Sequence, residues 1–219
     1  MHVDLRLYAL VDPAVAGGHT LTDLAGRIAG SATLVQLRDK HSSTRAMVEE
    51  ARALRGVLEP AGVPLLINDR VDVALAAEAD GVHIGQDDIS AADARLLLGR
   101  MAIIGLSVST VHQAQSAPLE LLDYVGIGAV FATSSKDDAN APIGPSGLRD
   151  IVRAIRARAP KFPICGISGI NANNAAEVIA AGADGVAVIS ALSMAPDPAK
   201  AAQDLRAVVD DALKRRGPS

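Results

Sequence analysis

Aromatic residues are nearly absent from this sequence. Its 219 residues include no tryptophan, two tyrosines and two phenylalanines, whereas 49% of them are hydrophobic. A core of that composition has to be built from valine, isoleucine, leucine and alanine, the residues that buried parallel sheets prefer. The shortage of rings therefore favours an α/β protein with a buried parallel sheet.

Cysteine is limited to Cys165, so an intramolecular disulfide is excluded. This residue lies in the apolar run 163–167 and is expected to be a small core side chain. A nucleophilic role would require a nearby base or a helix N-terminus to lower the pKa of the thiol. We therefore favour the core position.

Long apolar runs and basic patches are also missing. No run is long enough to span a bilayer, and the chain does not start with a basic stretch followed by an apolar one. The formal charge is −4, and the lysines and arginines are scattered rather than striped. We expect a soluble cytoplasmic protein that binds neither membranes nor nucleic acid. The basic cluster 214–216 is typical of a helix C-terminus.

Short apolar runs alternate with amphipathic stretches along the whole chain. This alternation is typical of successive βα units, and the length suits one (β/α)8 barrel, or TIM barrel. We predict a single catalytic domain over residues 1–219. The predicted strands are 5–11, 33–37, 65–68, 81–84, 102–106, 124–128, 164–167 and 186–189, and the predicted helices are 21–29, 43–58, 71–77, 91–98, 111–117, 147–158, 173–180 and 198–215.

Several boundaries carry a local signal. Asp197 and Pro198 are typical of a helix cap followed by proline at the first helical position. Asn174 is a candidate cap for a helix that ends near Gly182, where a positive φ is expected. Stretches 79–82 and 183–186 both read Ala-Asp-Gly-Val, which indicates two similar turns that enter strands.

One connection is unusually long. Residues 129–146 are rich in hydroxyl, charged and proline residues and show no helical period. Structureless segments of this length in compact domains are usually functional loops or lids. Because this segment follows the sixth strand, we expect it on the catalytic face of the barrel.

Polar residues cluster where the predicted strands end, which is where barrel enzymes hold their active sites. After the second strand, alternation places Gln36, Arg38 and Lys40 on one side. Two cations and an amide suit a strongly anionic ligand. A solvated charged loop is the alternative.

Carboxylates follow the third and fourth strands. Asp69 and Asp88 could share a Mg²⁺ ion, which takes one or two protein carboxylates and completes its octahedron with water and substrate phosphate. Asp87 and Asp88 could instead cap the next helix near Ser90, and we expect that role for Asp87 rather than for Asp88.

Later strand ends suggest a second anion site. Hydroxyls and an ammonium group occur in the run 133–136, and Gly169, Ile189 and Ser190 could present backbone N–H groups to a monophosphate. Ser107 ends the fifth strand. His83 has no second histidine or cysteine at a metal-binding spacing, so we expect it to be a packed, hydrogen-bonded residue.

These segments closely resemble the thiamine-phosphate synthase family over nearly the whole chain. The resemblance is carried by Leu7-Tyr8-Ala9-Leu10-Val11, Gln36-Leu37-Arg38-Asp39-Lys40, Asn68-Asp69, His83-Ile84-Gly85-Gln86-Asp87-Asp88, Tyr124-Val125-Gly126-Ile127-Gly128, Gly182-Ala183-Asp184-Gly185-Val186 and Ser190-Ala191-Leu192.

The resemblance implies a transferase that joins hydroxymethylpyrimidine pyrophosphate to thiazole phosphate, carboxylated or not, in thiamine biosynthesis. It implies one Mg²⁺ per subunit, held by Asp69 and Asp88, and a catalytic set of Arg38, Ser107 and Lys136. Pyrophosphate would leave first, and the thiazole nitrogen would capture the resulting methylene cation. The pyrimidine pyrophosphate would contact Gln36, Leu37, Arg38, Asp39, Lys40, Asn68, Ser107 and Lys136, and the thiazole phosphate would contact Thr133, Ser134, Ser135, Gly169, Ile189 and Ser190.

Three positions depart from the family pattern. Ser135 replaces a threonine, Ser168 replaces the first glycine of a pair, and Ser109 lies near a position where related thiazole tautomerases carry histidine. An isomerase of that kind and a phosphate-binding sensor without activity are the alternative functions. Only the transferase requires both Asp69 and Asp88. A homo-oligomeric state is left open.

Overall fold

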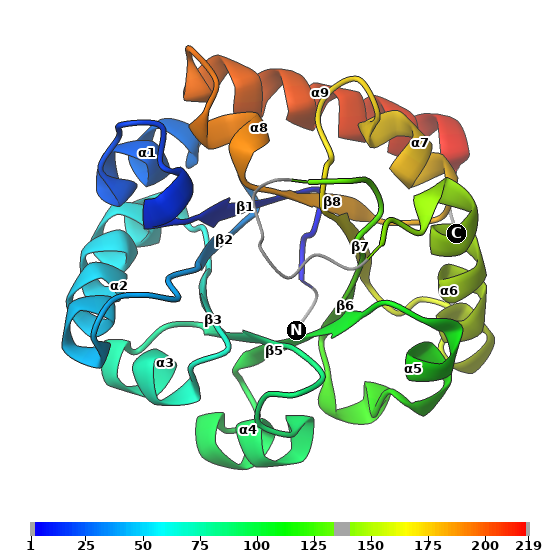
Figure 1. Ribbon diagram of the computed structural model, residues 1–219, viewed down its shortest axis with the longest axis horizontal. Coiled ribbons are helices and arrows are strands. Elements are labelled where there is room, and N and C mark those ends of the chain that lie inside the picture. The colour runs from blue at the N-terminus through cyan, green and yellow to red at the C-terminus, as the bar shows by residue number, and fades with distance from the viewer. Residues whose placement is uncertain (1–2, 134–140, 218–219) are drawn as a thin grey trace.

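Eight parallel strands form a closed barrel in chain order, as predicted (Figure 1). The computed structural model describes residues 3–133 and 141–217. Apart from β5, the strands are four or five residues long, and β1 closes the barrel by pairing with both β2 and β8. The strands are β1 (Leu7–Val11), β2 (Leu34–Leu37), β3 (Leu65–Asn68), β4 (Gly81–Ile84), β5 (Ile103–Val108), β6 (Tyr124–Ile127), β7 (Ile164–Ile167) and β8 (Gly185–Val188).

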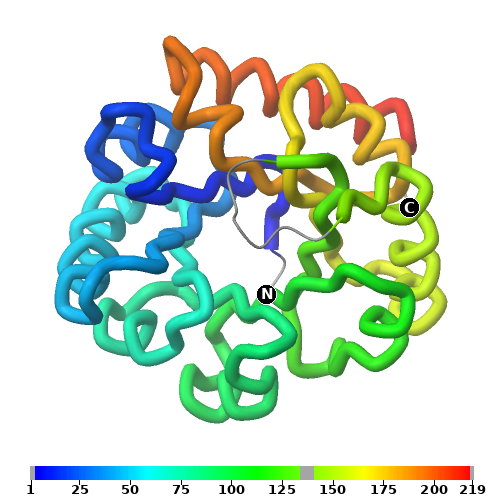
Figure 2. Tube along the Cα trace, viewed as in Figure 1, coloured from blue at the N-terminus to red at the C-terminus, as the bar shows by residue number. Residues whose placement is uncertain are grey.

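Helices surround the strands, and the path of the chain brings the last helix beside the first (Figure 2). The α-helices are α1 (Leu21–Ile28), α2 (Thr44–Leu58), α3 (Val71–Ala77), α4 (Ala91–Leu98), α5 (Val111–Ser116), α6 (Gly144–Arg158), α7 (Ala175–Ala180), α8 (Ser190–Ser193) and α9 (Pro198–Arg216). Short 3₁₀ turns lie at Pro13–Val15, Glu59–Ala61 and Leu119–Leu121.

The aliphatic composition fills two separate layers. The larger cluster lies between the strands and the helices and includes Val35, Leu37 and Ile104. The smaller cluster fills the barrel interior and contains Cys165, which is fully buried as predicted. Strand alternation separates the layers, since successive side chains point inward and outward.

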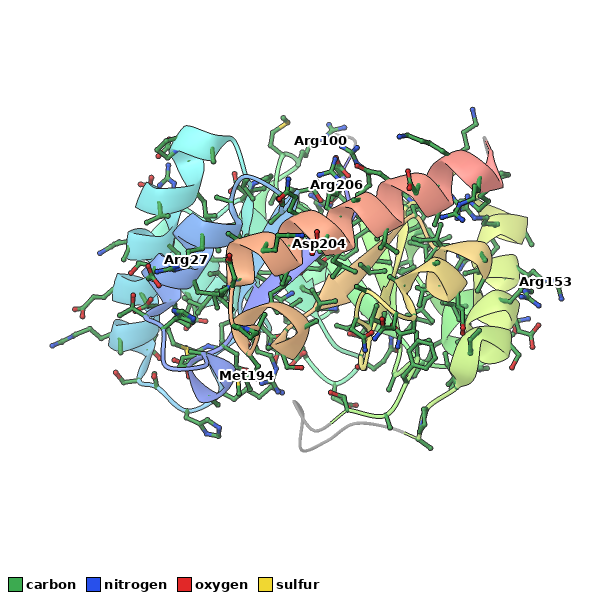
Figure 3. The ribbon with its side chains drawn as sticks, turned by 90° about the horizontal axis from the view of Figure 1, so that it is seen from above. Arg27, Arg100, Arg153, Met194, Asp204 and Arg206 are labelled. Carbon is green, nitrogen blue, oxygen red and sulfur yellow. The ribbon has the colours of Figure 1, made fainter. Side chains whose placement is uncertain are left out.

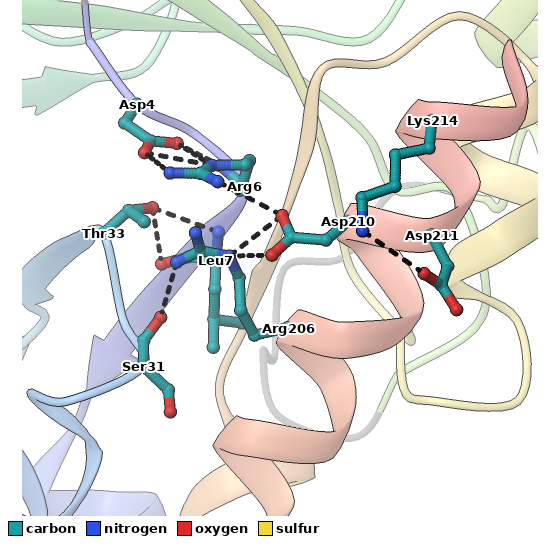
Figure 4. Close-up of polar contacts among 9 residues, drawn as sticks. All are labelled: Asp4, Arg6, Leu7, Ser31, Thr33, Arg206, Asp210, Asp211 and Lys214. Atoms are coloured by element: carbon teal, nitrogen blue, oxygen red, sulfur yellow. Dashed lines mark hydrogen bonds and ion pairs between the residues drawn. The ribbon is translucent and has the colours of Figure 1, made fainter. Parts of the chain in front are cut away.

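Polar contacts join the two ends of the chain at the N-terminal ends of the strands (Figure 4). Arg6 contacts both Asp4 and Asp210, and Arg206 on α9 also donates to Asp210. A second bond from Arg206 reaches the carbonyl of Ser31, 3.1 Å away, just before β2. These contacts attach α9 to the first two strands.

The repeated Ala-Asp-Gly turns have a shared structural reason. Asp80 and Asp184 each accept a hydrogen bond from the first backbone N–H of the preceding strand, at 2.7 and 3.0 Å. In each turn the following glycine, Gly81 or Gly185, lies so close to a neighbouring backbone that a Cβ atom would clash with it. The turns therefore use aspartate to cap a strand edge and glycine to allow close approach.

The predicted boundaries are wrong in several places, two of which lie near the site, and one helix was missed. Helix α6 begins at Gly144, three residues earlier than predicted, with Pro145 in its first turn, where proline is tolerated. Strand β8 ends at Val188, so Ile189 lies outside it. The four-residue helix α8 was not predicted, because a single helical turn shows no hydrophobic period.

Two cap predictions have different outcomes. Asp197 caps α9 by accepting a bond from the Lys200 N–H at 3.1 Å, as predicted. Asn174 occupies the cap position of α7, but its side chain accepts from the Asn171 N–H in the preceding loop. Gly182 has the expected positive φ, at 113°.

Across residues 3–133 and 141–217, no helix combines the length and apolar character needed to cross a membrane.

Candidate active site

Two neighbouring cavities open where the strands end. The first, of about 580 Å³, is lined mostly by residues in or just after β1 to β7, and the second, of about 440 Å³, mostly by residues in or just after β7 and β8. Met194 lines the second cavity and Arg100 precedes β5, so the two residues mark opposite faces of the barrel in Figure 3. Ile167 and Ser168 line both cavities.

Gln36, Arg38 and Lys40 all line the first cavity, which confirms that they share one side of the chain. Arg38 forms a buried ion pair with Asp12, which directly follows β1. This partner holds the guanidinium group in place. The alternative of a solvated loop is therefore wrong for Gln36 and Arg38, which are buried.

Leu37 and Asp39, by contrast, do not line either cavity. Leu37 points outward into the layer beneath the helices. The Asp39 carboxylate accepts hydrogen bonds from the N–H groups of His41 and Ser42, at 2.9 and 3.0 Å. Burial and these bonds act in opposite directions on the pKa of Asp39, and the net effect lowers it.

Asp69 and Asp88 lie together in the first cavity. Burial, and after it the neighbouring Asp88 carboxylate, raises the pKa of Asp69 to about 6, against the opposing effects of Lys40 and Asn68. Lys40 Nζ lies 3.7 Å from the Asp69 carboxylate, and the Asn68 amide donates to it at 2.6 Å. Asp69 also has a positive φ of 62°, which is uncommon for a residue other than glycine.

The loop after β4 directs Asp88 into the cavity. Its carboxylate accepts a bond from the Gly85 N–H at 2.7 Å. The next helix, α4, is capped by Ser90, which accepts from the Asp93 N–H at 3.0 Å. Neither Asp87 nor Asp88 is therefore the helix cap.

The Asp69 and Asp88 pair fits a hard divalent cation. The Asp88 carboxylate helps to raise the pKa of Asp69, and a cation held between the two carboxylates would relieve this repulsion. Within the described ranges no group of three or more His, Cys, Asp or Glu residues could hold a metal. Two protein carboxylates are enough for Mg²⁺, which keeps several waters and binds substrate phosphates.

A chain of polar side chains crosses the barrel interior beneath the first cavity. Ser107 Oγ lies 2.9 Å from His83 Nε2, and His83 Nδ1 lies 2.8 Å from the Tyr124 hydroxyl. The Tyr124 hydroxyl donates to the Tyr8 hydroxyl at 2.9 Å, and the Gln36 amide nitrogen also donates to Tyr8. His83 is thus a buried, hydrogen-bonded residue, as predicted.

The described residues that line the second cavity are all uncharged. Thr133, Gly169, Ile189 and Ser190 all line it, so the structure brings together the described members of the predicted phosphate site. Gly169 has a φ of 67° and lies against the backbone of Phe131 and Ala132, so a side chain would not fit. The other predicted members, Ser134 and Ser135, lie outside the described residues, as does Lys136.

Sequence reasoning missed three residues of this region. Asp12 directly follows the first strand and pairs with Arg38, and the order of the strand ends could have indicated it. Gln86 donates to the Ser107 carbonyl at 2.7 Å. Ser168, noted only as a departure from the family pattern, lies where the cavities meet and has a φ of 78°.

Comparison with known proteins agrees with this geometry. A family model described as thiamine monophosphate synthase matches residues 7–192. The chain belongs to the thiamine monophosphate synthase family. Membership identifies it as an enzyme of the transferase class that the sequence predicted.

Individual members of the family are similar to the chain over almost its full length. The thiamine-phosphate synthase of Moorella thermoacetica is 52% identical over 93% of this chain and 95% of its own. That of Agrobacterium fabrum is 49% identical over 99% of both chains. The solved thiamine phosphate pyrophosphorylase from Pyrococcus furiosus is 37% identical, with a TM-score of 0.83 over 96% of this chain and 98% of its own.

Proposed function

We propose that this thiamine monophosphate synthase family member condenses hydroxymethylpyrimidine pyrophosphate with thiazole phosphate, carboxylated or not, to give thiamine phosphate and pyrophosphate, with release of carbon dioxide when the thiazole carries a carboxyl group. One observation carries the proposal. A cavity that holds Arg38, Lys40, Asp69 and Asp88 adjoins a second, uncharged cavity through Ile167 and Ser168. Two substrates with different anionic groups could therefore meet at a shared wall.

In this proposal the first cavity binds the pyrimidine pyrophosphate. Arg38 and Lys40 face its phosphates, and Asp12 orients the Arg38 guanidinium group. Asn68, Gln36 and Ser107 surround the rest of the substrate. Lys136 is assigned to the pyrophosphate from the sequence alone.

Asp69 and Asp88 would hold one Mg²⁺ per subunit. The bound ion would neutralise negative charge on the pyrophosphate and so make it a better leaving group. The raised pKa of Asp69 supports this assignment, because burial beside a second carboxylate leaves its negative charge poorly compensated.

The proposed reaction is dissociative. The bond between the pyrimidine methylene carbon and the pyrophosphate oxygen breaks, and its electron pair leaves with the oxygen. The lone pair of the thiazole nitrogen then forms the new carbon–nitrogen bond. The chain supplies positive charge beside the leaving group from Arg38 and Lys40, and no protein nucleophile is required.

The thiazole phosphate would lie in the second cavity, against Gly169, Ile189, Ser190 and Thr133. We further propose that the reaction takes place in the cytoplasm, on small phosphorylated substrates.

Pyrophosphate release tests the function. Purified protein is mixed with both half-substrates and Mg²⁺, and pyrophosphate and thiamine phosphate are measured with and without a chelator. Release of both products only when Mg²⁺ is available supports the transferase. Isomerisation of thiazole phosphate without metal would favour the isomerase, and tight binding of one phosphate without turnover would favour the sensor.

A further inference from the structure

The buried polar chain is more elaborate than packing requires. It joins five side chains from β1, β2, β4, β5 and β6, and both of its ends, Gln36 and Ser107, line the first cavity. Among the residues that the structure describes, the side-chain oxygen of Gln36 is buried without a hydrogen-bond partner. Such an orphaned acceptor is uncommon and calls for a partner that the protein itself does not supply.

Two glycines make room for the rings of this chain. A Cβ atom at Gly105 would collide with the hydroxyl end of the Tyr124 ring. At Gly126 it would lie 3.1 Å from His83 Cε1. The interior positions on β5 and β6 are therefore kept empty so that a tyrosine and a histidine can meet at the barrel axis.

Hydrogen counting limits how the chain can be arranged. Each tyrosine hydroxyl has one hydrogen, and a neutral imidazole has one nitrogen that donates and one that accepts. If Ser107 donates to the cavity, its oxygen is free to accept from His83 Nε2. His83 Nδ1 then accepts from Tyr124, Tyr124 accepts from Tyr8, and Tyr8 accepts from the Gln36 amide. In this order Gln36 presents its carbonyl oxygen to the cavity.

The opposite order reverses both ends. Ser107 donates to His83, the hydrogens run through Tyr124 to Tyr8, and Tyr8 donates to the Gln36 oxygen. Ser107 then presents only lone pairs to the cavity, and Gln36 presents N–H groups. In the structure the two orders meet at Tyr8, which accepts from Tyr124 on one side and from Gln36 on the other. Hydroxyl hydrogens rotate freely enough for a ligand to select one order.

We propose that Tyr8, His83 and Tyr124 are positioning residues that couple Ser107 to Gln36 through one direction of hydrogen bonding. A phosphate oxygen only accepts hydrogen bonds, so at Ser107 it selects the first order. Gln36 then faces the substrate as an acceptor, matched to an N–H donor on the substrate ring. The inference rests on the proposed function in placing a phosphate oxygen at Ser107 and the substrate ring at Gln36.

The selectivity that follows is for a pair of groups rather than for either one. A substrate with an acceptor at Ser107 and a donor at Gln36 satisfies the whole chain. A substrate with hydrogen-bond acceptors at both ends places an acceptor against an acceptor at either Ser107 or Gln36. A buried acceptor left without a donor in this way is costly.

The protonated nitrogen of His83 reports the order directly. In the wild-type enzyme saturated with Mg²⁺ and inorganic pyrophosphate, ¹⁵N NMR of the imidazole is expected to show hydrogen on Nε2 and a bare Nδ1. In the structure Tyr124 donates to Tyr8, which leaves His83 Nδ1 as the donor to Tyr124, so the hydrogen is expected to move from Nδ1 to Nε2 when pyrophosphate is added. A purely structural histidine would keep one tautomer with and without pyrophosphate. Hydrogen on Nδ1 in the pyrophosphate complex would overturn the proposal, and this measurement needs neither turnover nor a variant.

Tyr124→Phe tests the coupling by kinetics. The variant removes one hydroxyl from the middle of the chain and leaves the ring beside Gly105. We expect kcat/KM for the pyrimidine pyrophosphate to fall about 10-fold, as for loss of one buried hydrogen bond, with KM for thiazole phosphate changed by less than about twofold. Tyr8→Phe serves as the second variant if Tyr124→Phe does not fold, and the same split is expected.

A folded variant with unchanged constants for both substrates would overturn the coupling. An equal loss for both substrates would also overturn it, since that pattern indicates general damage to the barrel. Wild-type enzyme is assayed first. If it releases no pyrophosphate, the proposed function fails, whereas the His83 tautomer still tests the coupling.

Discussion

Aspartates lie at both ends of the barrel, and their surroundings differ. At the N-terminal ends of the strands, Asp80, Asp123 and Asp184 each accept a bond from the first or second N–H of the strand before. Arginines pair with two of them: Arg95 reaches Asp123 at 2.8 Å, and Arg156 and Arg216 reach Asp184 at 2.8 and 2.9 Å. Every one of these carboxylates has donors suited to its negative charge.

At the C-terminal ends of the strands, the surroundings of the carboxylates are less favourable to their negative charge. Asp69 lies beside Asp88, and burial raises its pKa to about 6. Asp69 and Ser168, both just after strands, also have positive φ values of 62° and 78°. One end of the barrel therefore stabilises the fold, while the other holds repulsion and strain at the mouth where barrel enzymes bind their ligands.

The largest expected effect is on activity at the C-terminal end. Asp88→Ala should reduce thiamine-phosphate formation by at least about 100-fold, because a proposed metal ligand is lost. Asp87→Ala, which removes the other carboxylate that this loop brings to the same cavity, is the control and should keep most of the activity. Circular dichroism should show both variants folded. Full activity in Asp88→Ala would remove the metal assignment.

The second effect is on stability at the N-terminal end. Asp184→Ala should lower the free energy of unfolding by about 2–3 kcal/mol, because Arg156, Arg216 and the Ile164 N–H lose their partner. Urea denaturation measures the change, and activity per folded molecule should stay the same. Asp211→Ala is the control, since its exposed pair with Lys214 at 3.9 Å contributes little. Equal stability of the two variants would contradict the distinction drawn between the ends.

The third expected effect is a gain in stability on substitution, in contrast to the loss expected for Asp184→Ala. The folded-state pKa of Asp69 is raised from 3.8 to about 6, so the folded protein binds more protons than the unfolded chain between those values. The contribution of Asp69 to the free energy of unfolding should therefore be highest below about pH 4 and should fall as the pH rises through about 6.

Asp69→Asn should remove that pH dependence. With a chelator present at pH 7.5, the free energy of unfolding of the variant is expected to be higher by on the order of 1–2 kcal/mol, because the substitution removes a partly buried charge beside Asp88. The Asp69 side chain is 27% exposed, so solvent screens part of the repulsion and limits the gain. Urea denaturation at pH 5 and 7.5 checks both points. Destabilisation at pH 7.5 would show that the charged Asp69 carboxylate gains more from Lys40 and Asn68 than it loses through burial beside Asp88.

The smallest effect concerns backbone strain at Ser168. Holding a residue other than glycine at φ 78° costs about 1 kcal/mol of backbone strain. Glycine avoids this strain, but it loses part of the gain because it has more conformational freedom in the unfolded chain. Ser168→Gly should therefore be more stable by about 0.5 kcal/mol, and Ser168→Ala, which keeps the Cβ atom, should not. Thermal unfolding of the two variants separates the effect of backbone strain from the effect of losing the hydroxyl group. A larger gain from alanine would contradict the strain.

Much of the fold could be predicted from the sequence because each strand is a short apolar run between polar turns. The eight strands and their order follow from that pattern. Helix α8 could not be predicted, since Ser190–Ser193 is one turn long and depends on its contacts with α9. The start of α6 was missed because Gly144 and Pro145 usually indicate a loop.

The candidate site could be predicted where function follows strand order. Gln36, Arg38, Lys40, Asp69 and Asp88 lie at successive strand ends, so a barrel necessarily gathers them at one mouth. The partners of His83 could not be predicted in the same way. Tyr8 and Tyr124 are 116 positions apart and meet only because the closed barrel points both rings at its axis. Asp12 was missed because a single acidic residue just after the first strand gives only a weak signal.

The empty positions at Gly105 and Gly126 also constrain how this barrel can change over time. Each glycine shares its space with a ring from another strand, Tyr124 on β6 or His83 on β4, so neither member of a pair can be enlarged alone. Among relatives we expect residues 105 and 124 to be inherited as one unit, and likewise 83 and 126. A lineage that gains a side chain at 105 must first give up its tyrosine, and with it the link between the two ends of the cavity.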